Sequence, residues 1–477
     1  MEDLVKEREK QQFIKMTQTP IAKLVLSLGI PTMLSMMVTS LYNLADTYFV
    51  SLIGEDSVTA AVSNLLALMS IIQAVGFTFG MGAGSIVSSL LGKRDREGAD
   101  KVSSSSFAIA GVCGLLILVF GFLFLEPLMW LFGSRTPETL QYSISYATYI
   151  LISAPIMFMS FVLNNVLRAE GKAVLSMIGL IIGAVTNVVL DPIFIFALDM
   201  GITGAALATC LSQILGFVVL LFMFLSKRTI VRMRIGAISR EMKVYWDIIK
   251  TGFPSFSRQI LASLCTVFLN SAAYTYGGDS AQAALGVVQK MFMLAFSISL
   301  GIGQGYQPVL GYNYSAKFFA RVRSAYLFTM IFSTILMGAF SVICAIFAPS
   351  LMKIFSLSDS ATEIGVVALR FQCATMPLLP VNFMAGLTYQ VVGNKGVATL
   401  LSVSRQGLFY IPAVLILPAV LQLLGVQSCQ AVADLFAFFF AIPFTIMFFN
   451  ELKEKQAETT SIQEVVTELK MDYTDEL

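Results

Sequence analysis

The sequence predicts an all-α polytopic membrane protein whose twelve transmembrane helices form two pseudo-symmetric lobes of six helices each. Three observations support this fold class. The 477-residue chain is 57% hydrophobic and only 13% charged, which is too little charge for the surface of a soluble protein. Its apolar residues come in runs of about 20, long enough to span a hydrocarbon core as helices. Landmarks of the first half also recur in the second half at a nearly constant distance.

The apolar runs define the order of the elements along the chain. We expect the first six runs to form an N-lobe over residues 21–226 and the last six to form a C-lobe over residues 246–450. A polar segment over residues 1–20 precedes the lobes, a basic connector over residues 227–245 joins them, and a charged tail follows over residues 451–477. The connector is predicted as either a surface helix on anionic lipid headgroups or a solvated loop. The runs are centred near residues 40, 70, 115, 153, 185, 215, 265, 295, 335, 377, 408 and 438.

Lys and Arg are unequally divided between the two sets of loops that alternate along the chain. The set that includes both termini holds 25 of the 31 Lys and Arg residues, whereas the other set holds only Arg135 and Lys353. Loops rich in Lys and Arg stay on the cytoplasmic side of a membrane. We therefore expect a multi-pass protein of the inner or plasma membrane with both termini in the cytoplasm.

The internal repeat indicates how the two lobes are related. Each half carries an even number of spans, so both halves enter the membrane in the same direction. The two halves are then related by a rotation axis along the membrane normal, as in many secondary transporters. Three landmarks carry the repeat: Gly29-Ile30-Pro31 recurs as Gly252-Phe253-Pro254, the glycine-rich segment 80–84 recurs as 301–305, and Gly171 recurs as Gly393.

Several classes of protein are excluded by what the composition lacks. The chain contains no His, so it has no His metal site and no Ser-His-Asp triad. No glycine-rich loop matches a nucleotide-binding pattern, so any transport would draw on an ion gradient. The six Cys form no CxxC pair and read as buried small hydrophobic residues. We expect a monomer without enzymatic activity, without a cofactor other than a coupling ion, and without a nucleic-acid partner.

Seven ionisable residues lie near the middle of predicted spans. Each costs about 2.5–3.5 kcal/mol on insertion scales, which makes it a candidate functional residue. The two in the first half are both acids, whereas the second half carries one acid and four bases. They are Asp46, Asp191, Asp434, Arg258, Lys290, Arg370 and Arg405.

The acids of the first half stand next to amides at helical spacing. Asn43 and Asp46 are three residues apart, and Asn187 and Asp191 are four apart, so each pair shares a helix face. Thr209 follows in a stretch of small residues. Carboxylate, amide and hydroxyl oxygens can replace the hydration shell of Na⁺, and a buried carboxylate can instead bind a proton. In the structural alternative, each Asp caps a broken helix or pairs with a Lys or Arg.

The second half offers candidates for a substrate cavity. Its bases could neutralise Asp434 or could meet an anionic part of a substrate. Arg258 and Asp434 are candidates for the cavity wall, and Gln307 and Asn313 are candidates for its polar lining. A minority of the 38 Phe and 24 Met would complete a lining that adapts to varied ligands.

Four motifs resemble those of the multidrug and toxic compound extrusion (MATE) family, in particular its prokaryotic DinF-like and MepA-like exporters. The resemblance extends from residue 29 to about residue 434 and implies two six-helix lobes in a V, alternating access, and drug/Na⁺ or drug/H⁺ antiport. Other branches of the family use an acid pair in the C-lobe, for which this chain has only Asp434. The motifs are Tyr42-Asn43-Leu44-Ala45-Asp46, Arg168-Ala169-Glu170-Gly171, Asn187-Val188-Val189-Leu190-Asp191-Pro192, and Gly305-Tyr306-Gln307-Pro308 with Gly311-Tyr312-Asn313.

The resemblance also implies roles for single residues. Asp46, Asn187, Asp191 and Thr209 match the family's N-lobe cation site, which holds Na⁺ in sodium-coupled members. Tyr42 and Asn43 are neighbours of that site. Pro31 matches a proline whose kink responds to protonation in the family and would couple the ion to the shape of the cavity.

The implied function is secondary active efflux of small organic, cationic or amphipathic drugs or toxins in exchange for Na⁺ or H⁺. A lipid-linked precursor flippase of the same superfamily is the alternative, because Arg258, Arg370 and Arg405 could together form a cationic groove for a pyrophosphate. A non-transporting receptor or channel is the third hypothesis, but nothing in the chain resembles a selectivity filter or a ligand-binding domain.

Overall fold

The computed structural model describes residues 2–53, 56–134, 136–226, 229–355 and 358–475. Within these residues the chain is almost entirely helical and contains no β-strand. Eleven helices are long and apolar enough to cross a membrane. One of them, α9 (Met242–Ser315), is broken at Gly278, where φ is 64° and ψ is −161°. Because the broken helix supplies two crossings, the fold contains the twelve predicted spans.

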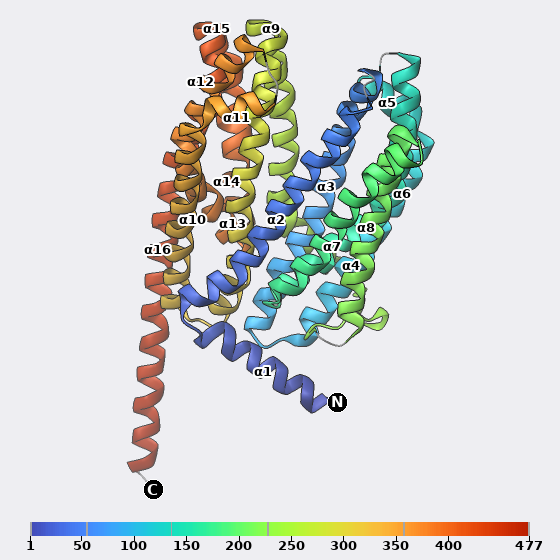
Figure 1. Ribbon diagram of the computed structural model, residues 1–477. Coiled ribbons are helices and arrows are strands. Elements are labelled where there is room, and N and C mark those ends of the chain that lie inside the picture. The colour runs from blue at the N-terminus through green and yellow to red at the C-terminus, as the bar shows by residue number, and fades with distance from the viewer. Residues whose placement is uncertain (1, 54–55, 135, 227–228, 356–357, 476–477) are drawn as a thin grey trace.

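The first lobe is built from the chain before the connector. In Figure 1 its helices form one bundle, coloured blue to green. A short helix, α5, joins two of the long ones, and a single π-helical turn, η1, extends α7. The elements are α2 (Ile21–Ser51), α3 (Asp56–Gly92), α4 (Arg96–Leu123), α5 (Leu125–Leu131), α6 (Pro137–Ala169), α7 (Ala173–Pro192), η1 (Ile193–Ala197) and α8 (Gly201–Leu225).

The second lobe begins with the two segments of α9. Its later spans are interrupted by a 3₁₀ turn, η3, and by a π-helical segment, η4. The elements are α10 (Phe319–Ile346), α11 (Ala348–Ile354), α12 (Asp359–Thr375), η3 (Met376–Leu378), α13 (Leu379–Val392), α14 (Lys395–Val403), η4 (Ser404–Tyr410), α15 (Ile411–Leu421) and α16 (Leu423–Asp475).

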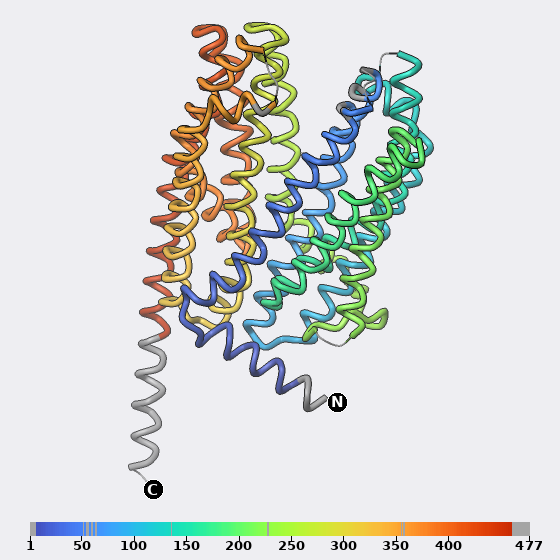
Figure 2. Tube along the Cα trace, viewed as in Figure 1, coloured from blue at the N-terminus to red at the C-terminus, as the bar shows by residue number. Residues whose placement is uncertain are grey.

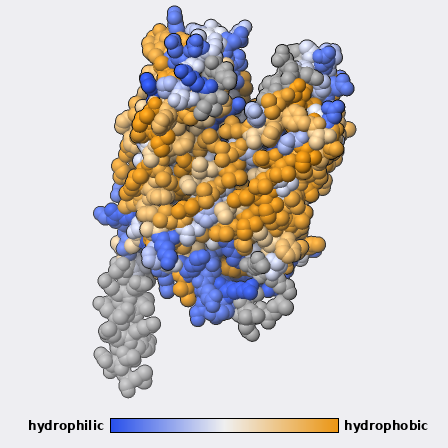
Figure 3. All heavy atoms as spheres, viewed as in Figure 1, coloured by the Kyte–Doolittle hydropathy of each residue, from blue (hydrophilic) through white to orange (hydrophobic). Residues whose placement is uncertain are grey.

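The two lobes are arranged as a V. Figures 1 and 2 show the bundles touching near α1 (Glu2–Gln18) and diverging toward the opposite end. We call these ends the α1 end and the open end. Figure 3 shows a broad apolar belt around the molecule, polar residues at both ends, and a notch between the lobes at the open end. An apolar belt between two polar ends is the surface that a membrane-spanning protein requires.

Local sequence signals fix where several helices begin. The side chain of Asp95 caps α4 by accepting a hydrogen bond from the backbone N–H of Gly98 at 2.9 Å. Thr136 caps α6 through Thr139 N–H at 3.2 Å, with Pro137 at the first helical position. These caps satisfy donors that would otherwise be left without partners at the helix N-termini.

The repeat landmarks meet at the contact between the lobes. A Cβ added to Gly305 on α9 would overlap the backbone of Gly29 on α2, and a Cβ added to Gly82 on α3 would lie 3.1 Å from the backbone nitrogen of Gly252 on α9. The shift of 223 residues that relates Pro31 to Pro254 also relates Gly29 to Gly252 and Gly82 to Gly305. The two contacts are therefore equivalent under the two-fold relation between the lobes. We call this close glycine contact the glycine seam.

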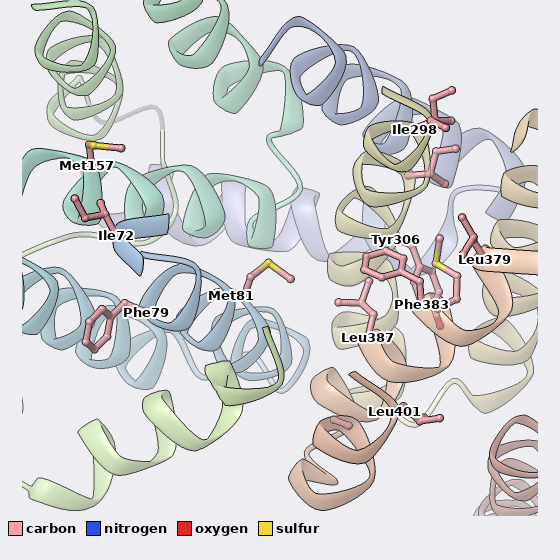
Figure 4. Close-up of a cluster of buried hydrophobic side chains, with 14 of the residues drawn as sticks. Ile72, Phe79, Met81, Met157, Ile298, Tyr306, Leu379, Phe383, Leu387 and Leu401 are labelled. Atoms are coloured by element: carbon pink, nitrogen blue, oxygen red, sulfur yellow. The ribbon is translucent and has the colours of Figure 1, made fainter. Parts of the chain in front are cut away.

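Buried apolar side chains fill both lobes. Figure 4 shows buried side chains gathered in two groups, with Ile72, Phe79 and Met157 in the first lobe and Tyr306 and Leu387 in the second. All five are at most 8% exposed. The two groups belong to one continuous buried cluster, because α9 of the second lobe packs along α2 and α3 of the first lobe.

The connector differs from the surface helix considered as one of its two predicted forms. Its described part, residues 229–241, contains only a 3₁₀ turn, η2 (Ile235–Ala237), and Lys227 and Arg228 lie outside the described residues. Side chains of the first lobe hold its backbone: Glu170 accepts from Ile230 N–H at 3.0 Å and from Val231 N–H at 2.9 Å. Helix α9 already begins at Met242, four residues before the expected start of the C-lobe.

The segment expected over residues 1–20 contains helix α1, which contacts both lobes. Gln12 donates to the backbone oxygen of Glu170 at 2.8 Å, and the Arg94 guanidinium lies 4.2 Å from the ring of Phe13. On the other lobe, Asn313 donates to the backbone oxygen of Met16 at 3.0 Å. The helix therefore bridges the lobes at the end where they touch.

Candidate functional site: a carboxylate pair in the first lobe

Two acids from distant parts of the sequence meet inside the first lobe. Asp46 lies on α2 and Asp191 lies near the end of α7, and these helices pack against each other. Their carboxyl groups are within hydrogen-bonding reach of one another. The Asp191 side chain is fully buried, and Asp46 is partly buried. The two acids predicted as one site therefore form a contact pair.

An amide and a hydroxyl complete the group. Asn187, one helical turn before Asp191, donates from Nδ2 to the Asp191 Oδ1 atom at 3.1 Å and to the Thr209 hydroxyl oxygen at 3.3 Å. Thr209 lies on α8, which packs against α7. The spacing of four residues places Asn187 and Asp191 on one face of α7, as the sequence predicts. All four residues of the predicted cation site thus lie together.

The group has more acceptor atoms than donors. Three oxygens without solvent exposure accept no hydrogen bond within the described part of the chain: Asp46 Oδ1, Asn187 Oδ1 and Asp191 Oδ2. Ionised carboxylates can only accept, so a contact between two of them needs a proton or a cation between their oxygens. The geometry therefore suits the binding of a small positive ion.

The described part of the chain places no base against the pair. Among the described residues, the five ion pairs of the chain include neither Asp46 nor Asp191. The structural alternative of an Asp paired with Lys or Arg is therefore not what this site contains. An unpaired buried acid pair is costly, and its occupant has to supply the missing positive charge.

Two further residues, which the sequence did not single out, lie around the acid pair. Tyr146 on α6 is buried and hydrogen-bonds Thr209, and Gln213 on α8 hydrogen-bonds Tyr42. Both tyrosines lie close enough to Asp46 and Asp191 to feel their charges. A tyrosine is uncharged and does not stand out in an apolar run. Hydropathy and charge counts therefore gave no signal for Tyr146.

The remaining predicted neighbours differ in their placement. Tyr42 faces the group, whereas Asn43 is exposed and makes no side-chain hydrogen bond to the group in the described chain. Pro31 lies inside α2, two residues after Gly29 of the glycine seam, and its backbone oxygen accepts from the Ser35 hydroxyl at 2.8 Å. Its role in coupling stays a prediction.

A break in regular helix geometry follows the acid pair. The π-helical turn η1 begins directly after Pro192, one residue beyond Asp191. Proline removes a backbone donor, and π-helical turns often mark functional positions. The expected helix break at Asp191 is thus a local change of helix type.

In the second lobe, the Asp434 carboxylate is neutralised internally. Arg405 Nε lies 2.8 Å from Asp434 Oδ1, and Gln430 Nε2 donates to the same oxygen at 2.9 Å. Arg405 belongs to the π-helical segment η4, and its guanidinium lies 4.9 Å from the centre of the Phe292 ring. Of the alternatives for the C-lobe bases, neutralisation of Asp434 is the one found for Arg405.

The two candidates for polar lining are occupied by packing contacts. Gln307 is 4% exposed and donates to the Ser85 hydroxyl at 2.9 Å across the lobe contact. Asn313 is fully buried, donates to Met16, and accepts from Arg321 Nε at 3.0 Å. In this conformation both residues join the lobes and α1 and do not line an open surface.

The other bases of the second lobe have different surroundings. Arg258 is partly buried with its guanidinium 5.2 Å from the centre of the Phe383 ring. Lys290 is partly buried, and Arg370 on α12 is exposed. None of the three takes part in an ion pair within the described residues.

A family profile described as MatE matches the chain twice, over residues 31–193 and over residues 254–416. The two matches are equally long, and the second starts 223 residues after the first, since 254 minus 31 is 223. This is the shift that separates Pro31 from Pro254. The profile therefore finds the same internal repeat as the glycine and proline landmarks.

Curated relatives match over most of the chain. The multidrug export protein MepA of Staphylococcus aureus is 26% identical over 428 residues, which cover 89% of this chain and 93% of the relative. The protein of the same name from Staphylococcus saprophyticus is 25% identical over 424 residues, with the same coverage of both chains.

Solved structures match with similar coverage. A structure described as the outward-facing conformation of a multidrug resistance MATE family transporter of the MOP superfamily has a TM-score of 0.88 and 28% identity, and the alignment covers 92% of this chain and 98% of the other. A MOP superfamily transporter from Pyrococcus furiosus has a TM-score of 0.87 with the same identity and coverage.

Proposed function

Because the chain belongs to the MatE family, we propose that it is a secondary active multidrug exporter that exchanges small organic compounds for Na⁺ or H⁺. The observation that carries this proposal is the contact between Asp46 and Asp191, which has no neutralising base among the described residues. The MepA relatives are named for multidrug export, and this chain matches them over most of the length of both proteins.

The coupling follows from electrostatics at the acid pair. With both carboxylates ionised, repulsion across their contact disfavours the close approach of α2 and α7. A bound cation, or a proton on one carboxyl, removes that repulsion and stabilises the approach. Because α2 also carries Gly29 of the glycine seam, a change in its packing reaches the contact between the lobes. Ion binding thereby shifts the balance between conformations that expose the cavity to opposite sides.

The donor set is compatible with either ion. The carboxylates, the Asn187 amide oxygen and the Thr209 hydroxyl are hard oxygen ligands for Na⁺. A proton shared between Asp46 and Asp191 would satisfy the same pair. The amide and hydroxyl distinguish these cases, because only a metal ion would require both as ligands.

The decisive test is efflux from proteoliposomes under separately imposed ion gradients. We expect ethidium efflux against its gradient when Na⁺ alone or H⁺ alone is supplied, and none without an ion gradient. Efflux that persists in the absence of both gradients would contradict an ion-coupled exporter.

Two variants connect the gradient to the site. Asp46→Asn and Asp191→Asn should each abolish gradient-driven efflux, since either one removes an ion-binding carboxylate. Asp199→Asn is the matched control: Asp199 lies in the same lobe, is exposed, and has a φ of 52°, which Asn tolerates. Efflux retained by both site variants would refute the assignment.

We also propose that both termini are cytoplasmic and that the V opens away from the cytoplasm. Lys and Arg crowd the loops at the α1 end, which favours that side as cytoplasmic. Single cysteines introduced at the α1 end of a Cys-free variant should react with an impermeant maleimide only after the membrane is permeabilised. Labelling in intact cells would reverse the orientation.

The flippase alternative gains no support from the geometry. The three arginines that would build its cationic groove have separate surroundings, because Arg405 is paired with Asp434, Arg258 lies over Phe383, and Arg370 is exposed on α12.

A further inference from the structure

Arg258 is a cation in a membrane-spanning segment without a counter-charge. The described residues provide neither an ion pair nor a hydrogen-bond acceptor for its guanidinium. An unpaired charge at this depth is costly, and the guanidinium offers five N–H donors in a fixed plane. Arg405, by contrast, has its own carboxylate. Arg258 is therefore the base of this lobe whose surroundings call for a ligand.

Aromatic rings occupy one side of this guanidinium. It lies 5.2 Å from the centre of the Phe383 ring, and Phe296 packs edge-on against Phe383 at 5.5 Å between ring centres. Phe292 then stacks with Phe296 at 6.0 Å. A guanidinium above a ring keeps its edge N–H groups free for another partner. The surroundings thus combine an anion-binding edge with an apolar aromatic wall.

Arg258 also stands where the two lobes begin to separate. Its neighbour Gln259 contacts Gln73 of the first lobe at 3.4 Å, and Ser297 on the second segment of α9 contacts Ser40 at 2.5 Å. The glycine seam lies on the α1 side of these contacts, since Gly252 precedes Arg258 by more than one helical turn. The Arg258 side chain is partly exposed, so its guanidinium remains accessible to a ligand.

The two lobes carry opposite charge within their spans. The first lobe presents the Asp46–Asp191 pair without a base. In the second lobe Arg405 and Asp434 cancel, which leaves Arg258, Lys290 and Arg370 without an ion pair among the described residues. Of these three, Arg258 directly precedes Gln259, which contacts the first lobe. A cargo with an anionic group on an aromatic scaffold would complement this wall, while the coupling ion occupies the acids of the other lobe.

We propose that Arg258 receives the anionic group of an aromatic cargo, with Phe383 and Phe296 contacting the aromatic part. The inference rests on the proposed export function and adds aromatic anions and zwitterions to the substrates of the exporter. A carboxylate, sulfonate or phosphate accepts two parallel hydrogen bonds from the edge of a guanidinium, which is the geometry that Arg supplies and Lys does not.

A pair of matched probes tests the assignment. Equilibrium dialysis would compare 2-naphthoate with its neutral isostere 2-naphthamide on purified full-length protein in phosphatidylcholine nanodiscs. The wild-type protein should bind naphthoate about 10- to 100-fold more tightly, the range expected for hydrogen bonds to a charged group. Arg258→Gln should remove this preference and leave naphthamide binding unchanged. Arg258→Lys should retain part of it.

Arg370→Gln is the control, because it removes an unpaired but exposed arginine from another helix of the same lobe. Equal binding of the two probes by the wild-type protein would overturn the proposal, and so would an unchanged preference in Arg258→Gln.

Ethidium efflux separates this inference from the proposed function. If wild-type proteoliposomes export ethidium but the protein shows no naphthoate preference, only the anion site fails. If ethidium efflux is absent under every ion gradient, the export function fails. Thermal unfolding of Arg258→Gln within a few degrees of wild type would show that any lost binding reflects the missing guanidinium.

Discussion

Removal of the Arg405 guanidinium should leave the Asp434 carboxylate buried in the second lobe without a counter-charge. The Asp434 side chain is fully buried, the Arg405 side chain is 12% exposed, and 2.8 Å separates Arg405 Nε from Asp434 Oδ1. Among the described residues, Gln430 is the other donor to that oxygen. Arg405→Gln would therefore leave a buried negative charge with only neutral hydrogen-bond donors, Gln430 and Thr375, beside it.

The expected cost follows from this burial. Breaking a buried ion pair by removing one partner costs about 3–5 kcal/mol, because the other charge stays uncompensated. Asp434→Asn should cost a similar amount, since it leaves Arg405 unpaired. The double variant should be less destabilised than either single variant, because two neutral amides can hydrogen-bond in place of the charges. A large coupling energy, in which the double variant loses less stability than the sum of the two single variants, is expected for a buried pair.

Reversible unfolding by SDS in mixed micelles measures these free energies. Glu451 and Lys455 provide the control, as they form an ion pair at 2.5 Å whose side chains are 37% and 39% exposed. Lys455→Gln should cost only about 0.3–0.5 kcal/mol. If Arg405→Gln costs no more than this control, the pair does not serve as buried charge compensation. Asp434→Asn should also retain ion-coupled efflux, because the proposed ion site lies in the other lobe.

Three further predictions concern the site, the seam and the connector. Tyr146→Phe removes a hydroxyl that hydrogen-bonds Thr209 and should weaken the apparent affinity for the coupling ion in efflux assays about 5- to 10-fold. Gly305→Ala adds a Cβ that overlaps the backbone of Gly29 and should lengthen the spin-label distance between the lobes at the α1 end. Glu170→Gln weakens the acceptor of two backbone N–H groups and should speed hydrogen exchange over residues 229–241.

Matched substitutions control each of these three. Tyr149→Phe alters a tyrosine on the same helix that has no contact with the acid pair in the described structure. Gly396→Ala adds a Cβ where nothing lies within 4 Å, and Glu97→Gln alters an exposed acid of the first lobe. An affinity, a distance or an exchange rate that changes equally in variant and control would refute the corresponding assignment.

The elements that sequence predicted best depend on local properties. An apolar run of about 20 residues can span the membrane whatever its tertiary contacts are. All twelve spans were therefore predictable. The break at Gly278 divides two of them within a short polar stretch, Gly277-Gly278-Asp279-Ser280, and the apolar runs on either side of it revealed both spans. Asp46 and Asp191 stood out because a charge in a span is rare whatever surrounds it.

The features that were missed depend on contacts between distant residues. Asn43 shares the i, i+3 spacing with Asp46, but the packing of α2 leaves its side chain exposed. Gln307 and Asn313 are polar residues in an apolar run. Only the fold shows that Gln307 contacts the first lobe and that Asn313 contacts α1. The connector backbone is held by Glu170 and, at 2.7 Å, by Asp100, partners that neither its charge nor its periodicity reveals.

The anchored connector determines where movement between the lobes is amplified. The last described residue before α9, Glu241, still forms an ion pair with Lys101 of the first lobe at 2.7 Å, so the chain has almost no slack before Met242. The part of α9 from Met242 to Gly278, which contains Pro254, is about 54 Å long as a helix and acts as a lever. A tilt of about 10° at the tethered end of this segment would move its other end by roughly 9 Å. A small rotation at the α1 end would therefore produce a much larger displacement at the open end.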